Sequence, residues 1–105
     1  MDAKNPSRVK IKVPKKELAN FCRRYHVQRL ALFGSVLGNN FRADSDVDVL
    51  VSFQPDAKIG FITFSRMQRE LAEFFNRQVD LIPMDGLKPI IRDFVLSNIE
   101  EVYVA

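Results

Sequence analysis

Two aspartates with one residue between them, Asp46 and Asp48, open the alternating segment 46–51. Such alternation predicts a strand, in which side chains two residues apart share a face. The two α-carbons would then lie roughly 6.6 Å apart. Because carboxylates at this spacing repel each other, a divalent cation between them is the usual way in which both stay ionised. Mg²⁺ fits best, since it takes one or two carboxylates and completes its shell with water and phosphate oxygens.

The pair Gly34-Ser35 precedes these acids and ends the short apolar run 30–33. Such a run predicts a buried strand that stops at a strand-to-helix turn. Glycine allows the backbone to approach a ligand closely, and Ser35 offers its N–H and its hydroxyl at the start of the next helix, where the dipole favours an anion. The turn therefore predicts a phosphate-binding site, and a triphosphate suits it.

A third acid, Asp80, lies within a second alternating run, residues 79–82. Three acids on neighbouring strands could hold two metal ions. In the alternative interpretation, residues 44–46 form an ordinary Asx turn and Asp80 closes a strand next to Arg77. The metal-binding interpretation is favoured because Asp48 stands in an apolar run, where an unpaired carboxylate is costly to bury.

Three further polar residues could take part in chemistry or in structure. Arg42 either clamps a phosphate or pairs with Asp44, and the two interpretations carry equal weight. His26 is expected to cap the C-terminal end of a helix, because no serine or cysteine nucleophile accompanies it as a partner for catalysis. Cys22 has apolar neighbours at helical spacing, which indicates a packing residue.

The elements that must position these residues alternate between helix and strand, which predicts an α/β (α+β) fold with a small mixed sheet and helices packed against it. The active site is expected at the end of the first two central strands. The last segment is either a strand or a tail that docks on another chain, and residues 9–13 suggest a short edge strand. The expected helices cover residues 15–25, 35–38, 61–76 and a segment from Pro89; the expected strands cover residues 30–33, 46–51, 79–82 and 99–104.

Apolar residues at helical spacing identify the faces of the last two helices that should pack inward. The helix at 61–76 carries a stripe of five apolar side chains, and the last helix carries four. These residues are Phe64, Met67, Leu71, Phe74 and Phe75 in the first case, and Ile90, Ile91, Phe94 and Val95 in the second.

The chain has 105 residues, which predicts a single domain, 1–105, with residues 1–7 flexible. This is too small to enclose two large substrates, so recognition of an acceptor would fall to a partner. With 47% hydrophobic and 28% charged residues, the composition gives no sign of disorder. No apolar run approaches the roughly 20 residues that span a bilayer, and residues 1–5 lack the apolar centre of a signal peptide. We therefore expect a cytoplasmic protein without membrane contact.

The net charge of +3 is mild, and the basic residues are spread along the chain. Nucleic acid is therefore not indicated as a partner, since basic residues at helix positions usually form a solvated face. The cluster from Lys10 to Lys16 could instead meet an acidic partner. The single cysteine excludes an internal disulfide and is compatible with a reducing compartment.

Residues 32–37 and 41–51, with Asp80 in the later strand, resemble the signature of the polymerase-β-type nucleotidyltransferase superfamily. More narrowly, the chain resembles the minimal nucleotidyltransferases that serve as antitoxins (MNT type), from Phe21 to the closing Val102-Tyr103. The resemblance implies that Asp46 and Asp48 are the metal-binding pair, that Asp80 is the third acid, and that Gly34 and Ser35 hold the nucleotide phosphates. Many relatives carry basic residues where this chain has Val36 and Leu37, so phosphate charge would be met by metal, backbone and Arg42.

The same resemblance implies the reaction and its partners. ATP would be the nucleotide donor, two Mg²⁺ ions would be bound, and the acceptor would be a tyrosine of a cognate HEPN-type toxin, which AMP would silence. An antitoxin that masks its toxin by contact, without catalysis, is the alternative. Addition of nucleotides to RNA is disfavoured, because the chain has no room for an RNA-holding domain. The number of nucleotides transferred and the choice between a homo- and a hetero-oligomer stay open.

Overall fold

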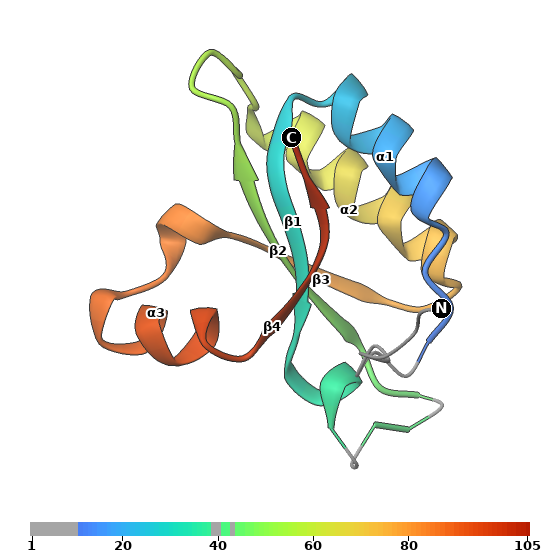
Figure 1. Cartoon of the computed structure of the whole chain (residues 1–105). Helices are drawn as coiled ribbons and strands as arrows, with labels where there is room; N and C mark the ends of the chain where they lie inside the picture. Colours follow the sequence, from blue (N-terminus) through green and yellow to red (C-terminus); the bar gives the residue numbers. More distant parts are fainter. Residues whose placement is uncertain (1–10, 39–40, 43) are drawn as a thin grey trace, which may run out of the picture.

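The computed structural model describes residues 11–38, 41–42 and 44–105, in which helices and strands alternate (Figure 1). In chain order the elements are α1 (Lys15–Arg24), β1 (Val27–Phe33), the 3₁₀ turn η1 (Gly34–Leu37), β2 (Val47–Phe53), α2 (Phe61–Phe75), β3 (Val79–Pro83), the 3₁₀ turn η2 (Met84–Gly86), α3 (Pro89–Leu96) and β4 (Ile99–Val104). The expected helices and strands from residue 15 onward are thus present, and the last segment is a strand.

The four strands form one mixed sheet in the order β3-β2-β1-β4. Strand β1 is antiparallel to both of its neighbours, whereas β2 and β3 are parallel. The mixed sheet with helices confirms the predicted fold class. One row of the register joins three strands, because Asp48 of β2 pairs with Phe33 of β1 and with Asp80 of β3.

The hydrophobic core lies between the sheet and the helices α1 and α2, which run side by side on one face of the sheet (Figure 1). Alternate residues of β2 and β3 point into this core. Because side chains alternate along a strand, Asp48 and Asp80 point to the opposite face. The residues of α1, α2, β2 and β3 that are buried in this cluster are Leu18, Phe21, Cys22, Val47, Val49, Val51, Met67, Leu71, Phe75, Val79 and Leu81.

Both long helices end at residues in the left-handed backbone region. His26, with φ 57°, follows α1, and its N–H donates to the carbonyl of Arg23. Asn76, with φ 53°, closes α2. Asparagine adopts this conformation more readily than most residues, and such a residue commonly terminates a helix. His26 thus follows the end of the helix, whose C-cap residue is Tyr25, and capping by the imidazole of His26 stays a prediction.

A hydrogen-bonded group ties α1 to α2 next to the core. The hydroxyl of Tyr25 and Nη1 of Arg24 both donate to the carboxylate of Glu70, the latter at 3.0 Å. Burial acts to raise the pKa of Glu70, but the hydrogen bonds from Tyr25 and Arg24 outweigh it and hold that pKa below its ordinary value. Burial also raises the pKa of the nearby Cys22 thiol to about 12, which suits the predicted packing role.

Two expectations fail in the described part of the chain. Residues 11–13 are not in a strand, and residues 9 and 10 lie outside the described residues, as do 1–7. The predicted inner face of α3 is also wrong, because Ile90 is 87% and Phe94 is 73% exposed and α3 contains no buried residue. The apolar pattern marks one side of this helix, but α3 stands apart from the core that α1 and α2 cover (Figure 1).

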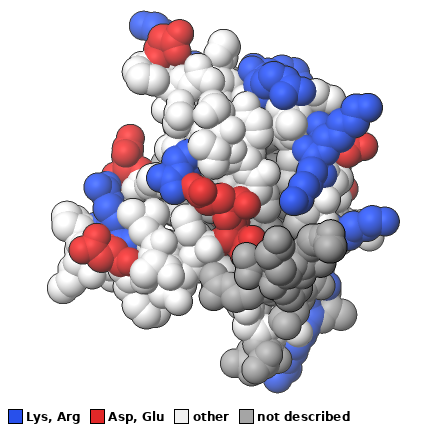
Figure 2. Space-filling model, in the orientation of Figure 1, with Lys and Arg blue, Asp and Glu red and all other residues white. Residues whose placement is uncertain are grey.

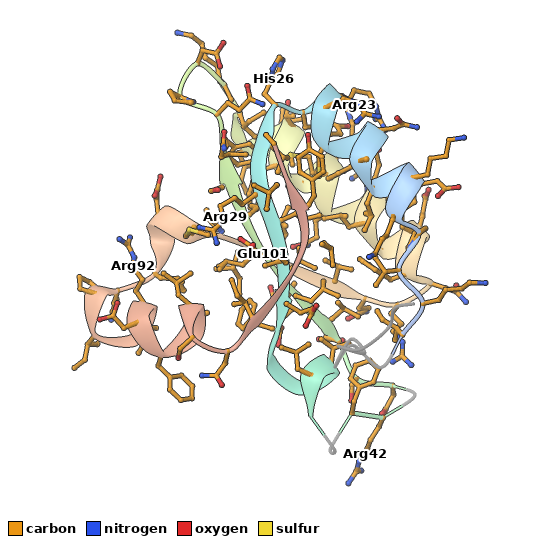
Figure 3. The ribbon with its side chains drawn as sticks, in the orientation of Figure 1. Arg23, His26, Arg29, Arg42, Arg92 and Glu101 are labelled. Carbon is orange, nitrogen blue, oxygen red and sulfur yellow. The ribbon has the colours of Figure 1, made fainter. Side chains whose placement is uncertain are left out.

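Charged side chains are interspersed on the surface. On the face in Figure 2, basic and acidic side chains lie in several separate groups and do not form one continuous basic stripe. One such contact joins β1 to β4, where Nε of Arg29 donates to the carboxylate of Glu101 at 2.6 Å (Figure 3). Among the described residues no helix is long and apolar enough to cross a membrane.

Candidate active site

The predicted acids come together at one edge of the sheet, on the face opposite α1 and α2. Asp48 and Asp80 are register partners in the parallel pair β2–β3, and Asp46 precedes β2 by one residue. Burial raises the pKa of Asp48, and the charges of Asp80 and Asp46 raise it further. Asp48 is half-buried, whereas Asp46 and Asp80 are exposed. The three carboxylates are therefore close enough for Asp48 to sense both of the others.

The Gly34 turn touches this group of acids directly. Because β1 and β2 are antiparallel, the end of β1 lies beside the start of β2, and Gly34 follows the residue that pairs with Asp48. Gly34 has φ +80°, and a Cβ atom added to it would overlap Oδ2 of Asp48. Glycine is thus required here by its backbone conformation and by the carboxylate that occupies the space of a side chain. The structure therefore brings together the two motifs that the sequence separates.

Beyond Gly34 the chain forms a single 3₁₀ turn, in which the N–H of Gly38 donates to the carbonyl of Ser35 at 2.9 Å. Ser35 is exposed, whereas Val36 is fully buried in the core. Val36 therefore anchors the turn to the sheet, and the exposed Ser35 stays available to a ligand.

Arg42 is held by its backbone in the loop that leads to the acids. Its N–H donates to Oγ of Ser45 at 2.9 Å, and the N–H of Ser45 donates to its carbonyl at 3.1 Å. The side chain points away from the body of the domain (Figure 3). Within the described residues no ion pair joins it to Asp44. A phosphate contact by Arg42 stays a prediction.

Arg77, which the sequence analysis did not assign to the site, holds this loop in place. Its Nη1 donates to the carbonyl of Arg42 at 2.8 Å and to the carbonyl of Ser45 at 3.1 Å. Its guanidinium also lies over the ring of Phe41, 4.3 Å from the ring centre. Because Arg77 connects the turn before β3 to the loop before β2, it links the segments that carry Asp80 and Asp46. The only feature of the sequence that could have pointed to Arg77 as part of the site is its position three residues before Asp80.

The other two candidates lie away from the acids. His26 precedes β1, at the opposite end of that strand from Gly34 (Figure 3). Cys22 is buried in α1. Neither residue can contribute to chemistry at the acids.

Several cavities open on the surface of the described residues, and the largest of the following three is distant from the acids. It has a volume of about 530 Å³ and lies at the opposite ends of β2 and β3, where Phe53 and Pro83 contribute to its lining. A cavity of about 370 Å³ adjoins Asp46 and Arg77. Another, of about 470 Å³, lies between the Gly34 turn and α3. The two cavities beside the acids, not the largest one, are relevant to chemistry there.

The donor set decides which metal the site could hold. The described residues include no group of three or more His, Cys, Asp or Glu side chains that is already arranged around a common metal position. The fit therefore rests on the position of Asp48, whose carboxylate lies against the Gly34 turn and whose register partner on β3 is Asp80. A hard divalent cation suits these oxygen donors, and Mg²⁺ needs only one or two carboxylates when phosphate oxygens complete its shell. Asp46, Asp48 and Asp80 are the residues that could hold it.

Comparison with known proteins gives the family by sequence, and solved structures share the fold. The family model described as nucleotidyltransferase domain matches residues 15–103. The chain is 33% identical over 90 residues to protein adenylyltransferase MntA of Thermococcus cleftensis, covering 86% of this chain and 84% of that protein.

Two solved structures share the fold. A crystal structure of a toxin–antitoxin with AMP-PNP superposes with a TM-score of 0.70 at 18% identity, covering 89% of this chain and 75% of that chain. The second is the structure of a tri-AMPylated HEPN toxin of Shewanella oneidensis in complex with an MNT antitoxin. One chain of this complex superposes with a TM-score of 0.63 at 18% identity, covering 87% of this chain and 70% of that chain. From the family match and the MntA relative, we conclude that the chain belongs to the nucleotidyltransferase family and, within it, to the protein adenylyltransferases.

Proposed function

We propose that this chain transfers AMP from ATP to a tyrosine hydroxyl of a cognate HEPN-type toxin and acts as its antitoxin. The relative from T. cleftensis is named a protein adenylyltransferase, and the S. oneidensis complex contains an AMPylated HEPN toxin with its antitoxin. These names support both the donor and the class of acceptor. We further propose that the reaction requires Mg²⁺ and that two ions are bound.

One observation carries the proposal: the carboxylate of Asp48 lies directly against Gly34, and Asp80 is its register partner on β3. A turn that accepts phosphate thus adjoins a concentrated negative charge that would repel phosphate if it were left uncompensated. A cation resolves this conflict, because it binds the carboxylates and the triphosphate together. A purely structural cluster would have no reason to place three acids beside such a turn.

Each residue of the site then has a role. Gly34 lets the triphosphate approach the backbone, and Ser35 donates to it. Asp46 and Asp48 would hold one cation, and Asp80 would contribute to a second. When bound there, Mg²⁺ would compensate the charge of the triphosphate and lower the pKa of the attacking hydroxyl.

The reaction is an in-line displacement at the α-phosphorus of ATP. The acceptor hydroxyl oxygen forms a bond to that phosphorus, and the bond to the leaving pyrophosphate breaks. The proton of the hydroxyl passes to the carboxylate of Asp80, which is exposed and therefore reachable by a group on another protein. The chain supplies the donor site, and the toxin brings the hydroxyl.

Incubation of the chain with ATP labelled at the α-phosphate, Mg²⁺ and a HEPN toxin tests the proposal. Label should appear on the toxin, and Asp46→Asn or Asp48→Asn should lower the rate at least ~10²-fold. Asp56→Asn, an exposed acid in the turn between β2 and α2, is the matched control and should keep the rate. Neutralisation of the toxin without label, unaffected by Asp46→Asn, would instead establish an antitoxin that acts by masking.

A further inference from the structure

The cavity between the Gly34 turn and α3 has the size and walls of a small-molecule site. Its volume is about 470 Å³, within the range of roughly 300 to 1,000 Å³ that is typical of ligand pockets. Its lining is mainly apolar and includes two aromatic side chains and one amide. The lining includes Phe33, Gly34, Leu37, Phe94 and Asn98.

The position of this cavity relative to the acids is fixed by strand pairing. Phe33 pairs with Asp48 on one side and with Ile99, the first residue of β4, on the other. The end of α3 and Asn98 are thereby brought beside Gly34. A nucleotide whose phosphates lie on the Gly34 turn would have the acids on one side and this cavity on the other.

Phe94 gives the cavity an aromatic wall that the fold itself does not use. The side chain is 73% exposed although it stands beside a turn built for an anionic ligand. Phe33, which is half-buried, provides a second ring. Aromatic rings are the usual stacking surface for bases, and each base–aromatic contact is worth about 1–3 kcal/mol.

Asn98 presents only a hydrogen-bond acceptor to a ligand. Its Nδ2 donates to the carbonyl of Phe94 at 2.8 Å and to Oγ of Ser97 at 3.1 Å. Oγ of Ser97 already donates its own proton to the Phe94 carbonyl, at 2.9 Å, so it can only accept from Asn98. Because a side-chain amide has two N–H donors and both are used, its oxygen, Oδ1, is the group left for a ligand.

We propose that this cavity binds the adenine base of the ATP donor, with Phe94 stacking on the ring and Oδ1 of Asn98 accepting a hydrogen bond from the 6-amino group. Guanine carries a carbonyl oxygen at that position and cannot donate to Asn98. This inference rests on the proposed function and deepens it, because it assigns the residues that select ATP over GTP.

The first test compares binding of ATP and of inorganic tripolyphosphate, both with Mg²⁺, by isothermal titration of the full chain. Phe94→Ala should weaken ATP binding about tenfold and leave tripolyphosphate binding unchanged. Ile90→Ala is the matched control: it removes another exposed apolar side chain of α3, one that does not line the cavity, and should bind ATP as the wild type does.

The second test measures the ratio of ATP affinity to GTP affinity, which a general loss of folded protein does not change. The wild type should prefer ATP about tenfold. Asn98→Ala should lose this preference, whereas Asn98→Asp, which keeps an acceptor oxygen, should retain it.

Equal affinity of the wild type for ATP and GTP, or a parallel loss of tripolyphosphate and ATP binding in Phe94→Ala, would overturn the base site and leave the proposed AMP transfer intact. Failure of the wild type to bind ATP at all would overturn both proposals.

Discussion

The carboxylate of Asp48 occupies the space into which a side chain at position 34 would project, so Asp48 and Gly34 lie in direct contact across the β1–β2 pair. The contact joins the residue that would hold the cation to the turn that would hold the phosphates. Since both are fixed by an antiparallel strand pair, their relative position is set by the sheet and does not depend on a flexible loop.

Gly34→Ala should therefore damage the site in two ways. The new methyl group would displace the Asp48 carboxylate, and φ +80° is unfavourable for alanine by about 1–2 kcal/mol. We expect the rate of AMP transfer to fall about 10²-fold, because a displacement of about 1 Å in a catalytic group has that effect. Gly60→Ala, where no atom lies within 4 Å of the new Cβ, should keep the rate. Full activity of Gly34→Ala would contradict the contact described above.

Asp48→Asn should increase stability in the absence of metal while it abolishes transfer. The pKa of Asp48 is raised in the folded protein, so its ionised form destabilises the fold above that pKa. As pH falls from neutral through the raised pKa, Asp48 takes up a proton and this destabilisation disappears. Thermal melts in EDTA should show the variant melting above the wild type at neutral pH, with a difference that shrinks on acidification. If the difference in melting temperature between Asp48→Asn and the wild type does not change with pH, Asp48 does not have a raised pKa in the folded protein.

Mg²⁺ should stabilise the wild type but not a variant that lacks the carboxylates of both Asp46 and Asp48. Binding to the folded state alone adds about 2.7 kcal/mol at a concentration one hundred times the dissociation constant. The melting temperature should therefore rise with Mg²⁺ concentration for the wild type and for Asp56→Asn. It should stay constant for the double variant Asp46→Asn with Asp48→Asn. The same rise in the double variant would show that the cation binds elsewhere.

Arg77→Lys should make the reaction require more Mg²⁺. Lysine keeps the charge but cannot reproduce the planar guanidinium that bonds to two carbonyls and covers Phe41. The loop that carries Asp46 would then be less well positioned, and we expect the half-saturating Mg²⁺ concentration to rise about tenfold, the usual scale for one lost charge-assisted hydrogen bond. Arg69→Lys, an exposed arginine of α2, is the control. Guanidinium ions should partly restore Arg77→Ala, which general unfolding would not permit.

Tyr25→Phe should affect stability and leave the chemistry unchanged. The substitution removes the hydroxyl that donates to Glu70, between α1 and α2, at a cost of about 1 kcal/mol. Denaturant unfolding should report this loss, while the rate of transfer stays at the wild-type value. A reduced rate in folded Tyr25→Phe would show that the helix layer influences the acids through the sheet.

The sequence was sufficient to predict the features that depend on local pattern. Alternation placed Asp48 and Asp80 in strands, and periodicity placed Met67 and Leu71 in the core. The site was expected at the end of the first two central strands, but it lies at the end of β1 and the start of β2, because these two strands are antiparallel.

Features that depend on distant neighbours could not be predicted in this way. The apolar side of α3 suggested packing, but periodicity does not tell whether another element covers a face, and Phe94 is exposed. The role of Arg77 was missed because its acceptors, Arg42 and Ser45, lie more than thirty positions earlier in the chain. A pattern within one segment contains no information about such a contact.

The turn between α2 and β3 has a consequence for how this chain can vary. Only three residues, Asn76 to Gln78, separate the helix from the strand, and the Gln78 carbonyl accepts the N–H of Val47 at 2.9 Å. Because strand side chains alternate, inserting or deleting a single residue here would rotate Asp80 toward the helices and turn Val79 outward. The length of this short connection is therefore constrained as strictly as the identity of the acid that follows it.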